Sequence, residues 1–446
     1  MSRKNTRMQQ KPKTFLGNFT FARKNYDWWV VVVVGILTIG GLAFLASSLA
    51  PQDMSNFHQE FLYQLIFGVW VGGVLMYIFA RLDYHHLLTW RKPFLAVAML
   101  GLLFLGIVGA AAQMQGLRGT ELVEFVGRFD NPVLSPFIAN QSIRWIQTPV
   151  MVIQASEVAK IALLIYFAGH LNLLANRKDQ PITWLDMKKP LYAFLAAAAL
   201  IIVQPDLGSI LLIYMILFST MFVGKVPAKI WATFTLGMIG FGLFFTLATP
   251  YRRLRLMSVF QRGTDASFQI DGVEDAIQNG GLFGQGYGNS EAKQRRTILE
   301  SSTDSIIGVI GEEMGFFATI LFLSLYLVLL DRGLKIAEQA PDVGGQALAT
   351  GISIWIITQA FLNIGGNIGI VPLKGLPLPF VSEGGSAIVL NLASIGILLN
   401  VSAQGLKKNI EKQAAFKKMR FEKLIPGTQK VFRRRTQAEK KNLRVV

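Results

Sequence analysis

The sequence predicts an all-α polytopic membrane protein with ten transmembrane helices. Of its 446 residues, 52% are hydrophobic and only 16% are charged, and the mean hydropathy is +0.42. Several apolar runs reach about 20 residues, the length that a helix needs to cross the hydrocarbon core. Lysine and arginine collect at the two ends and in alternate loops, which is the charge pattern of multi-pass membrane proteins.

The ten apolar segments lie at 28–49, 61–80, 93–112, 155–174, 190–204, 207–224, 229–249, 305–330, 347–368 and 386–404. The fifth is short, and Pro205 is expected to form a tight turn before the sixth. An even number of crossings places both termini on one side, and the Lys/Arg-rich loops indicate that this side is the cytoplasm. Two extracytoplasmic loops are then long, at about 113–154 and, between the seventh and eighth helices, at about 250–304.

Basic tails flank the expected membrane domain, which spans 27–404. Residues 1–26 hold seven Lys/Arg and no acid, and residues 405–446 hold fourteen Lys/Arg and three acids. This placement favours cytoplasmic retention and contact with anionic lipid over nucleic-acid binding. The absence of cysteine excludes disulfides and thiolate metal sites.

The second long loop contains YRRLRL (Tyr251–Leu256), Arg262, KQRR (Lys293–Arg296) and the Gly-rich run NGGLFGQGYGN. Arginine forks and exposed backbone N–H groups both bind phosphate. Two interpretations stay open: a solvated, charge-balanced loop, or a site for an anionic headgroup.

Carboxylates near the expected membrane boundary are the main candidates for chemistry. Asp304, at the start of the eighth helix, could cap that helix or accept a proton from a substrate hydroxyl. Glu312 and Glu313 lie deeper and are expected to face other helices. Asp206 follows a Pro turn, where a helix cap is the simplest role.

Glu157 and Lys160 are spaced i, i+3, so they share one helix face. They form either a local pair that lowers the cost of insertion or the polar floor of an outward-facing cavity. The loop Pro372–Ala387 offers Ser382, Gly384, Gly385 and Ser386 as hydrogen-bond donors. With Asp304 and Asp206 on the same outer face, these residues favour a site for an amphiphilic, phosphate-bearing substrate.

Six motifs then support a family resemblance. They are IRWI (Ile143–Ile146), QASEVAK (Gln154–Lys160), QPDLG (Gln204–Gly208), GGLFGQGYGNS (Gly280–Ser290), STDSIIGVIGEEMG (Ser302–Gly315) and LPLPFVSEGGS (Leu376–Ser386). In order and spacing, the chain resembles the SEDS family (shape, elongation, division and sporulation) from about Asp27 to Ser402. It is closer to the FtsW/SpoVE branch than to RodA.

The resemblance implies a peptidoglycan glycosyltransferase of the bacterial cytoplasmic membrane, acting in cell division or cell-wall growth. Such enzymes polymerise lipid II on the outer face with inversion at the anomeric carbon. Asp304 matches the catalytic aspartate. Arg144, Trp145, Glu157, Lys160, Arg252, Arg253 and Arg255 match family positions. The expected substrate-binding set also includes Asp206, Ser382, Glu383, Gly384, Gly385 and Ser386. A class B penicillin-binding transpeptidase and other divisome or elongasome proteins are the expected partners, with no covalently bound cofactor.

Five positions depart from the family pattern: Ala155, Ser302, Ser305, Glu383 and Ala387. Glu383 replaces a usual tyrosine and adds an acid beside the expected site. It could raise the pKa of a neighbouring carboxyl or help hold a divalent cation, Mg²⁺ or Mn²⁺. Two alternative functions remain from this sequence: a lipid II flippase and a non-catalytic division scaffold.

Overall fold

The computed structural model describes the chain in twelve stretches. These are residues 26–49, 54–117, 119–129, 131, 134–139, 142–177, 180–248, 250–257, 268–294, 298, 301–372 and 375–424.

Each of the ten predicted apolar segments lies in a helical part of the chain. The main helices are α1 (Trp28–Leu49), α3 (Val71–Arg81), α5 (Arg91–Met114), α7 (Ala155–Ala175), α8 (Trp184–Val203), α9 (Leu207–Val223), α10 (Ala228–Ala248), α14 (Ile306–Gln339), α15 (Val343–Asn367) and α16 (Gly385–Leu424). A helix α2 (Met54–Tyr63) and a π-helical stretch η2 (Gln64–Trp70) lead into α3 without a break. Together they form the predicted second span.

Eight spans within the described residues are long and apolar enough to cross a membrane. Of the two other helices, α9 has 17 residues. The helix α8 carries Asp186, Lys188 and Lys189 in its first turns. It begins earlier than the sequence pattern suggested, because Thr183 and Asp186 form a capping box at its start. Gln204 and Pro205 form the predicted turn between α8 and α9.

The all-α prediction was wrong for the first long loop, which contains a small antiparallel sheet. The strands are β1 (Ser135–Ala139), β2 (Ser142–Gln147) and β3 (Val152–Gln154), in the order β1-β2-β3. Aromatic and β-branched residues in SIRWIQ suit a pleated, half-buried surface. The loops also hold the short helices α4 (Tyr84–Thr89), α6 (Gly119–Gly127), α11 (Pro250–Met257), α12 (Phe268–Gly280) and α13 (Glu291–Gln294).

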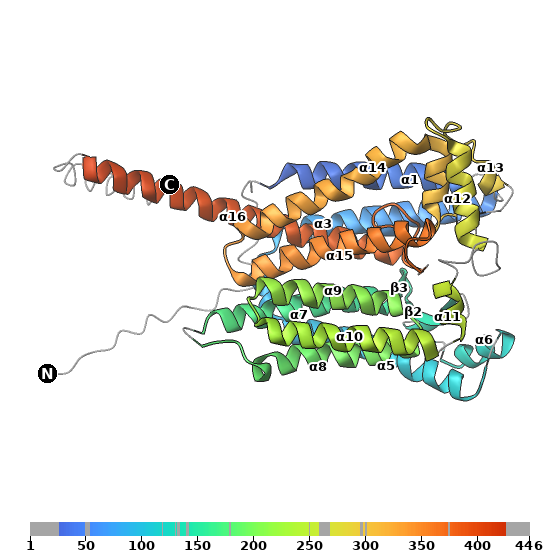
Figure 1. Ribbon diagram of the computed structural model, residues 1–446, viewed down its shortest axis with the longest axis horizontal. Coiled ribbons are helices and arrows are strands. Elements are labelled where there is room, and N and C mark those ends of the chain that lie inside the picture. Colours follow the sequence, from blue (N-terminus) through green and yellow to red (C-terminus); the bar gives the residue numbers. More distant parts are fainter. Residues whose placement is uncertain are drawn as a thin grey trace.

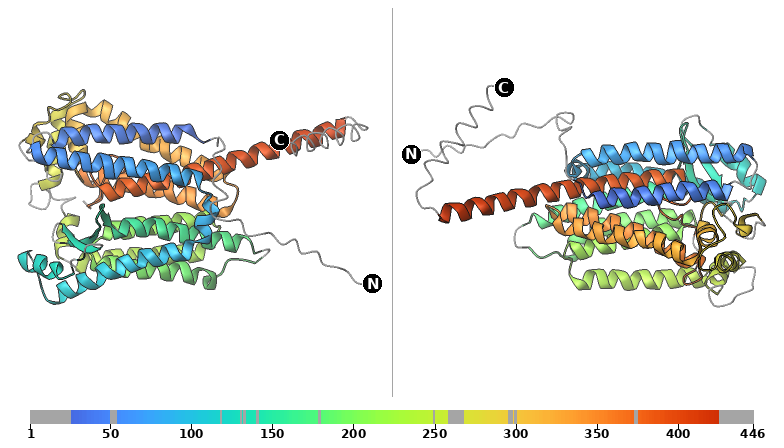
Figure 2. Two further views of the ribbon diagram at one scale, coloured as in Figure 1. Left: turned by 180° about the vertical axis from the view of Figure 1, so that it is seen from behind. Right: turned by 90° about the horizontal axis from the view of Figure 1, so that it is seen from above.

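The long helices run side by side along one axis (Figure 1). At one end of the bundle lie α6, the sheet, α11, α12 and α13, so both long loops share that end. The helix α15 packs against α7, α9, α14 and α16, which makes it the central element. From the opposite end, the C-terminal part of α16 projects beyond the other helices in all three views (Figure 2). The predicted tail from residue 405 therefore begins as a continuation of the tenth helix.

The helix α14 is interrupted at Gly315, whose φ is 75° and ψ is 178°. A left-handed φ of this kind favours glycine. At the break, Phe316 donates its backbone N–H to Gly281 O at 2.9 Å. The Gly-rich run therefore packs against the main chain of α14, and a Cβ on Gly315 would collide with it.

The end of the bundle opposite the long loops is tied together around His85. Its two ring nitrogens contact Asp83 at 2.7 Å and Asp342 at 2.6 Å. Asp342 caps α15 by accepting from the Gly345 N–H. The hydrogen bonds to Asp342 and Asp83 raise the pKa of the His85 imidazole to about 9. A protonated His85 therefore links α4 to the start of α15.

Candidate active site

Asp304 lies in a turn at residues 301–305, immediately before α14. The cap position of α14 belongs to Ser305, so Asp304 stands one residue outside it. Its backbone carbonyl accepts hydrogen bonds from Asn363 Nδ2 at 2.8 Å and from Asn367 Nδ2 at 2.7 Å. The Asp304 side chain is half-buried. The backbone of the turn is thus fixed by α15.

The loop before α16 is held by side chains that bind its carbonyls. Asn363 donates to Leu376 O, Gln359 to Pro377 O, Tyr326 to Pro379 O and Gln64 to Ser382 O. Proline and glycine leave this segment without a regular hydrogen-bond ladder. Its polar backbone is buried and must be satisfied by other groups. Side chains from three different helical elements, α15, α14 and η2, meet that need.

Glu383 stands beside the Asp304 turn, as the sequence predicted for an acid in this loop. Its N–H donates to Ser302 O at 2.9 Å. Next to it, the Gly384 N–H donates to Gln64 Oε1 at 3.2 Å. Ser382 is buried, and its hydroxyl accepts from the Leu378 N–H. The Ser382 N–H in turn donates to Leu378 O at 3.0 Å. Of the four predicted donors, the N–H groups of Ser382 and Gly384 are therefore already engaged within the protein.

Asp206 is the N-cap of α9, as its position after the Pro turn suggested. One carboxylate oxygen accepts from Ser156 Oγ at 3.0 Å, Ser209 Oγ at 2.7 Å and Gln154 Nε2 at 3.3 Å. The Gln154 N–H also donates to Ser386 Oγ. The starts of α7, α9 and α16 therefore join in one polar cluster at the loop-bearing end.

Arg144 and Trp145 lie on β2, and Trp145 pairs with Gln154 of β3. The Arg144 guanidinium donates to Gln204 O at 2.7 Å and to Pro205 O at 2.9 Å. Arg144 therefore stabilises the turn at Gln204 and Pro205, which precedes Asp206. The sheet thus brings the predicted Arg-Trp pair to the Asp206 cluster.

Glu157 and Lys160 form the predicted local pair, with Lys160 Nζ 2.6 Å from Glu157 Oε1. Both side chains are almost fully buried, at 1% and 0% exposed. Lys160 also donates to Gln359 Oε1 at 3.1 Å and lies over the Trp355 ring. Gln359 in turn donates to Pro377 O. Lys160 is therefore linked through Gln359 to the loop before α16.

The basic residues predicted to contact a headgroup divide into two groups. Arg253 on α11 is exposed, while the side chains of Arg252 and Arg255, together with Arg262, Arg295 and Arg296, lie outside the described residues. Lys293 is buried and pairs with Glu313 at 2.7 Å. The interpretation of KQRR as a solvent-facing cluster was therefore wrong for Lys293.

The Gly-rich run is likewise used internally. The N–H groups of Gln285 and Gly286 donate to Glu312 O and Glu313 O at 2.9 and 3.1 Å. The Glu312 carboxylate accepts from Ser290 Oγ and from the Ala292 N–H. As predicted, Glu312 and Glu313 face other elements and not the Asp304 site. Both bind the segment that follows α12.

Within the described part of the chain, no group of three or more acidic, His or Cys side chains is placed to hold a metal ion. A divalent cation can also be held by only two carboxylates. Mg²⁺ keeps several waters and is commonly held by one or two carboxylates plus substrate phosphates. Asp304 and Glu383, on backbone segments joined by the bond to Ser302 O, fit that donor chemistry.

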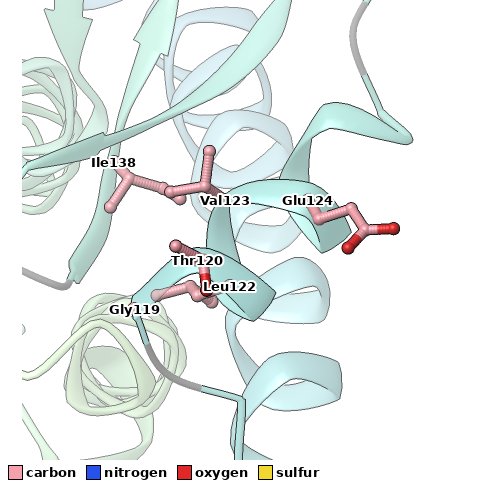
Figure 3. A pocket seen from close by; sticks show the side chains of 6 residues that line it. All are labelled: Gly119, Thr120, Leu122, Val123, Glu124 and Ile138. Atoms are coloured by element: carbon pink, nitrogen blue, oxygen red, sulfur yellow. The ribbon is translucent and has the colours of Figure 1, made fainter.

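A hollow of about 550 Å³ lies between α6 and β1, away from the residues above (Figure 3). Its lining is Gly119, Thr120, Leu122, Val123, Glu124 and Ile138. The Glu124 carboxylate points away from the other side chains. None of the predicted site residues lines this hollow, so it does not define the active site.

The sequence reasoning missed the amides of α15. Gln359, Asn363 and Asn367 are spaced by four residues, so they form one stripe on an otherwise apolar helix. All three are buried. This repeat of amides at i, i+4 and i+8 was the available signal. It marks the face of α15 that carries the Asp304 turn and the loop before α16.

A protein-family model described as "Cell cycle protein", which covers FtsW, RodA and SpoVE, matches residues 133–407. The matched region includes Asp304, the loop before α16 and the whole α15 stripe. The chain belongs to this family. The resemblance read from the six motifs is thereby confirmed, and the chain is a multi-pass membrane protein.

Relatives within the family match nearly the full length. A "Probable peptidoglycan glycosyltransferase FtsW" of Geobacter sp. (strain M18) is 32% identical over 388 residues, covering 85% of this chain and 97% of the relative. "Stage V sporulation protein E" of Bacillus subtilis (strain 168) is 32% identical over 381 residues, covering 83% and 95%.

Solved structures share the fold at lower identity. A chain from the work described as "Structural coordination of polymerization and crosslinking by a peptidoglycan synthase complex" superposes with a TM-score of 0.65 at 22% identity, covering 85% of this chain and 98% of that one. The rod shape determining protein RodA of Thermus thermophilus gives a TM-score of 0.58 at 23% identity, covering 84% and 96%.

Proposed function

We propose that this family member is a peptidoglycan glycosyltransferase that polymerises lipid II into glycan strands. The observation that carries the proposal is the setting of Asp304. It is a half-buried carboxyl on a turn fixed by two amides, at the end of the bundle that also holds Asp206 and the long loops. The names of the FtsW relatives support the same activity.

In this reaction, Asp304 acts as general base. Its carboxylate accepts the proton from the 4-hydroxyl of the acceptor sugar as that oxygen attacks C1 of the donor MurNAc. The bond from C1 to the diphosphate oxygen breaks, and undecaprenyl diphosphate leaves with the electron pair. Attack opposite the leaving group inverts the anomeric centre.

The remaining predicted residues divide between binding and support. We propose that Arg253 binds the diphosphate, together with Arg252 and Arg255 of the same short helix. Arg144, Trp145, Asp206, Glu157, Lys160 and residues 382–386 shape the site around it. A divalent cation held by Asp304 and Glu383 would neutralise charge on the departing diphosphate.

The flippase alternative depended on Glu312 and Glu313, the acids closest to the membrane interior. Both are engaged with Ser290, Lys293 and Ser47 in a buried network. A fixed ion pair of this kind is poorly suited to a path along which a charged headgroup must move. The scaffold alternative leaves Asp304 without a role. The transferase is therefore the better-supported function.

The same proposal places ten crossings in the bacterial cytoplasmic membrane, with both basic tails in the cytoplasm and α6, the sheet and α11–α13 outside. A class B penicillin-binding transpeptidase is the proposed partner. One of the structural relatives belongs to a peptidoglycan synthase complex that is described as coordinating polymerization and crosslinking, and this supports the pairing. Other divisome or elongasome proteins are proposed to bind in addition.

The test uses purified full-length protein, fluorescent lipid II and gel separation of products, with and without the transpeptidase. Wild type is compared with Asp304→Asn and with Asp331→Asn, a matched change in an exposed acid paired to Lys335. Parallel reactions contain Mg²⁺, Mn²⁺ or EDTA. We expect glycan ladders from wild type and Asp331→Asn and at least about 100-fold less product from Asp304→Asn.

Ladders of equal length and yield from Asp304→Asn would exclude Asp304 as the base. The absence of ladders from every variant, even with the transpeptidase, would contradict the transferase. In that case, a dithionite-protection assay with labelled lipid II in vesicles decides between flippase and scaffold. Product formation that EDTA leaves unchanged would remove the divalent cation from the mechanism.

A further inference from the structure

The turn that carries Asp304 depends on another helix for its position. Residues 301–305 precede α14, so helix hydrogen bonds do not fix them. The Asp304 carbonyl is bound twice, by Asn363 and Asn367 of α15. Both asparagines are 1% exposed. Water therefore cannot replace them without opening the core.

Asn363 also contacts the loop before α16, whereas the second hydrogen bond of Asn367 stays within α15. In that loop, Leu376 O accepts from Asn363 Nδ2 at 2.8 Å. A side-chain amide carries two hydrogens, so one can serve each carbonyl. Asn363 thus joins the Asp304 turn to the loop through a single planar group.

The loop backbone runs directly against the reactive carboxyl. A methyl group placed on Gly375 would lie 3.1 Å from Asp304 Oδ2. Leu376, the residue bound by Asn363, follows Gly375 in the chain. The same amide therefore fixes the main chain of Asp304 and the segment that lines its carboxylate.

We propose that Asn363 is a positioning residue, which clasps the Asp304 turn to the loop at 375–384 and so sets where the carboxylate stands relative to its substrate. The proposal rests on the assignment of Asp304 as general base. A shift of about 1 Å in a catalytic group can lower a rate by about 100-fold. Loss of the clasp should therefore reduce turnover while lipid II binding, which uses many other contacts, persists.

The experiment compares Asn363→Leu with Asn400→Leu. Asn400 is a matched control, because it is also a fully buried asparagine that bridges two backbone groups. It donates to Ala80 O at 2.8 Å and accepts from the Tyr84 N–H at 3.2 Å, at the other end of the bundle. Each substitution removes a buried amide that hydrogen-bonds two backbone groups, and the two remove similar volume; Asn400→Leu also removes the bond accepted from Gln404 Nε2. They should lower stability alike.

Two readouts separate positioning from general stability. With lipid II as substrate, we expect kcat of Asn363→Leu to fall about 10- to 100-fold with KM within about threefold, and kcat of Asn400→Leu to stay within about threefold. Hydrogen exchange followed by mass spectrometry should rise at 301–305 and 375–384 in Asn363→Leu only. The near-isosteric Asn363→Asp, which loses both donors, should reproduce the kcat loss if the leucine variant does not fold.

Equal losses of kcat in the Asn363 and Asn400 variants would overturn the proposal, because stability alone would then explain them. Unchanged exchange at 301–305 and 375–384 in Asn363→Leu would also overturn it, whatever the activity. Failure of the proposed function has a different signature: Asp304→Asn would form ladders like wild type. The exchange measurement tests the clasp in either case.

Discussion

Two buried lysine–glutamate pairs in this protein have nearly the same N–O distance but connect different parts of the fold. Lys160 and Glu157 lie 2.6 Å apart on one helix, and Lys293 and Glu313 lie 2.7 Å apart on α13 and α14. Lys293 also donates to Ser47 Oγ of α1 at 2.6 Å. Both members of the first pair lie on α7, whose backbone hydrogen bonds would survive its loss, and Lys160 makes one further hydrogen bond, to Gln359 of α15. The second joins three elements, one of which is a helix of only four residues.

The comparison shows that a buried ion pair matters for what it connects as well as for its own attraction. Removing one partner leaves an uncompensated charge in either case. At Lys293, removal also breaks the side-chain link between α13, α1 and α14. The predictions that follow test this difference, from the largest expected effect to the smallest.

We expect Lys293→Met to lower the free energy of unfolding by about 3–5 kcal/mol, because Glu313 is left buried without its counter-ion just before the break in α14 at Gly315. Denaturant unfolding in detergent micelles measures this change. The double variant Lys293→Met/Glu313→Met should lose less than the two single variants added together. Additive losses would contradict the assignment of a direct pair.

We expect a smaller cost, about 2–3 kcal/mol, for Lys160→Met. Glu157 lies in the first turn of α7, where the helix dipole stabilises a lone carboxylate. The same unfolding measurement applies, and Glu157→Gln in the Lys160→Met background should recover part of the loss. If Lys160→Met and Lys293→Met lowered the unfolding free energy equally, neither the helix dipole nor the number of connected elements would affect the cost of losing the lysine.

The His85 contacts provide an intermediate case at the opposite end. Because the folded-state pKa of His85 is raised from 6.5 to about 9, its stabilisation is complete below pH 6.5 and is lost as pH rises through 9. Nearly half of the His85 side chain is exposed, so the effect should be about 1 kcal/mol or less. The thermal midpoint of wild type should fall between pH 6.5 and 9.5. His85→Gln should flatten that fall, and equal slopes would refute the assignment.

Lys335 and Asp331 form the surface counterpart of the two buried pairs. They are spaced i, i+4 with a 2.7 Å contact, and both side chains are 52% exposed. Water and salt screen such a pair, so Lys335→Met should change the unfolding free energy by less than about 0.5 kcal/mol. A loss above about 1 kcal/mol would show that solvent exposure does not explain why this pair should matter less than the two buried pairs.

The sequence by itself determined what is local or additive along the chain. Apolar length predicted the segments that form the main helices, because a long apolar run that crosses lipid must satisfy its backbone polar groups within a helix. Spacing of i, i+3 predicted the Lys160–Glu157 pair, and the position after a Pro turn predicted the Asp206 cap. Six short motifs were sufficient to indicate the family.

The tertiary structure alone decided which distant segments meet. Hydropathy carries no information on whether Lys293 turns outward to solvent or inward to Glu313. Nor does it place the Asp304 turn beside Leu376, since those segments are more than 70 residues apart. The stripe of Gln359, Asn363 and Asn367 was visible in the sequence, but its partners were not. Their hydrogen bonds depend on how α15 packs among its neighbours, which is a property of the whole bundle.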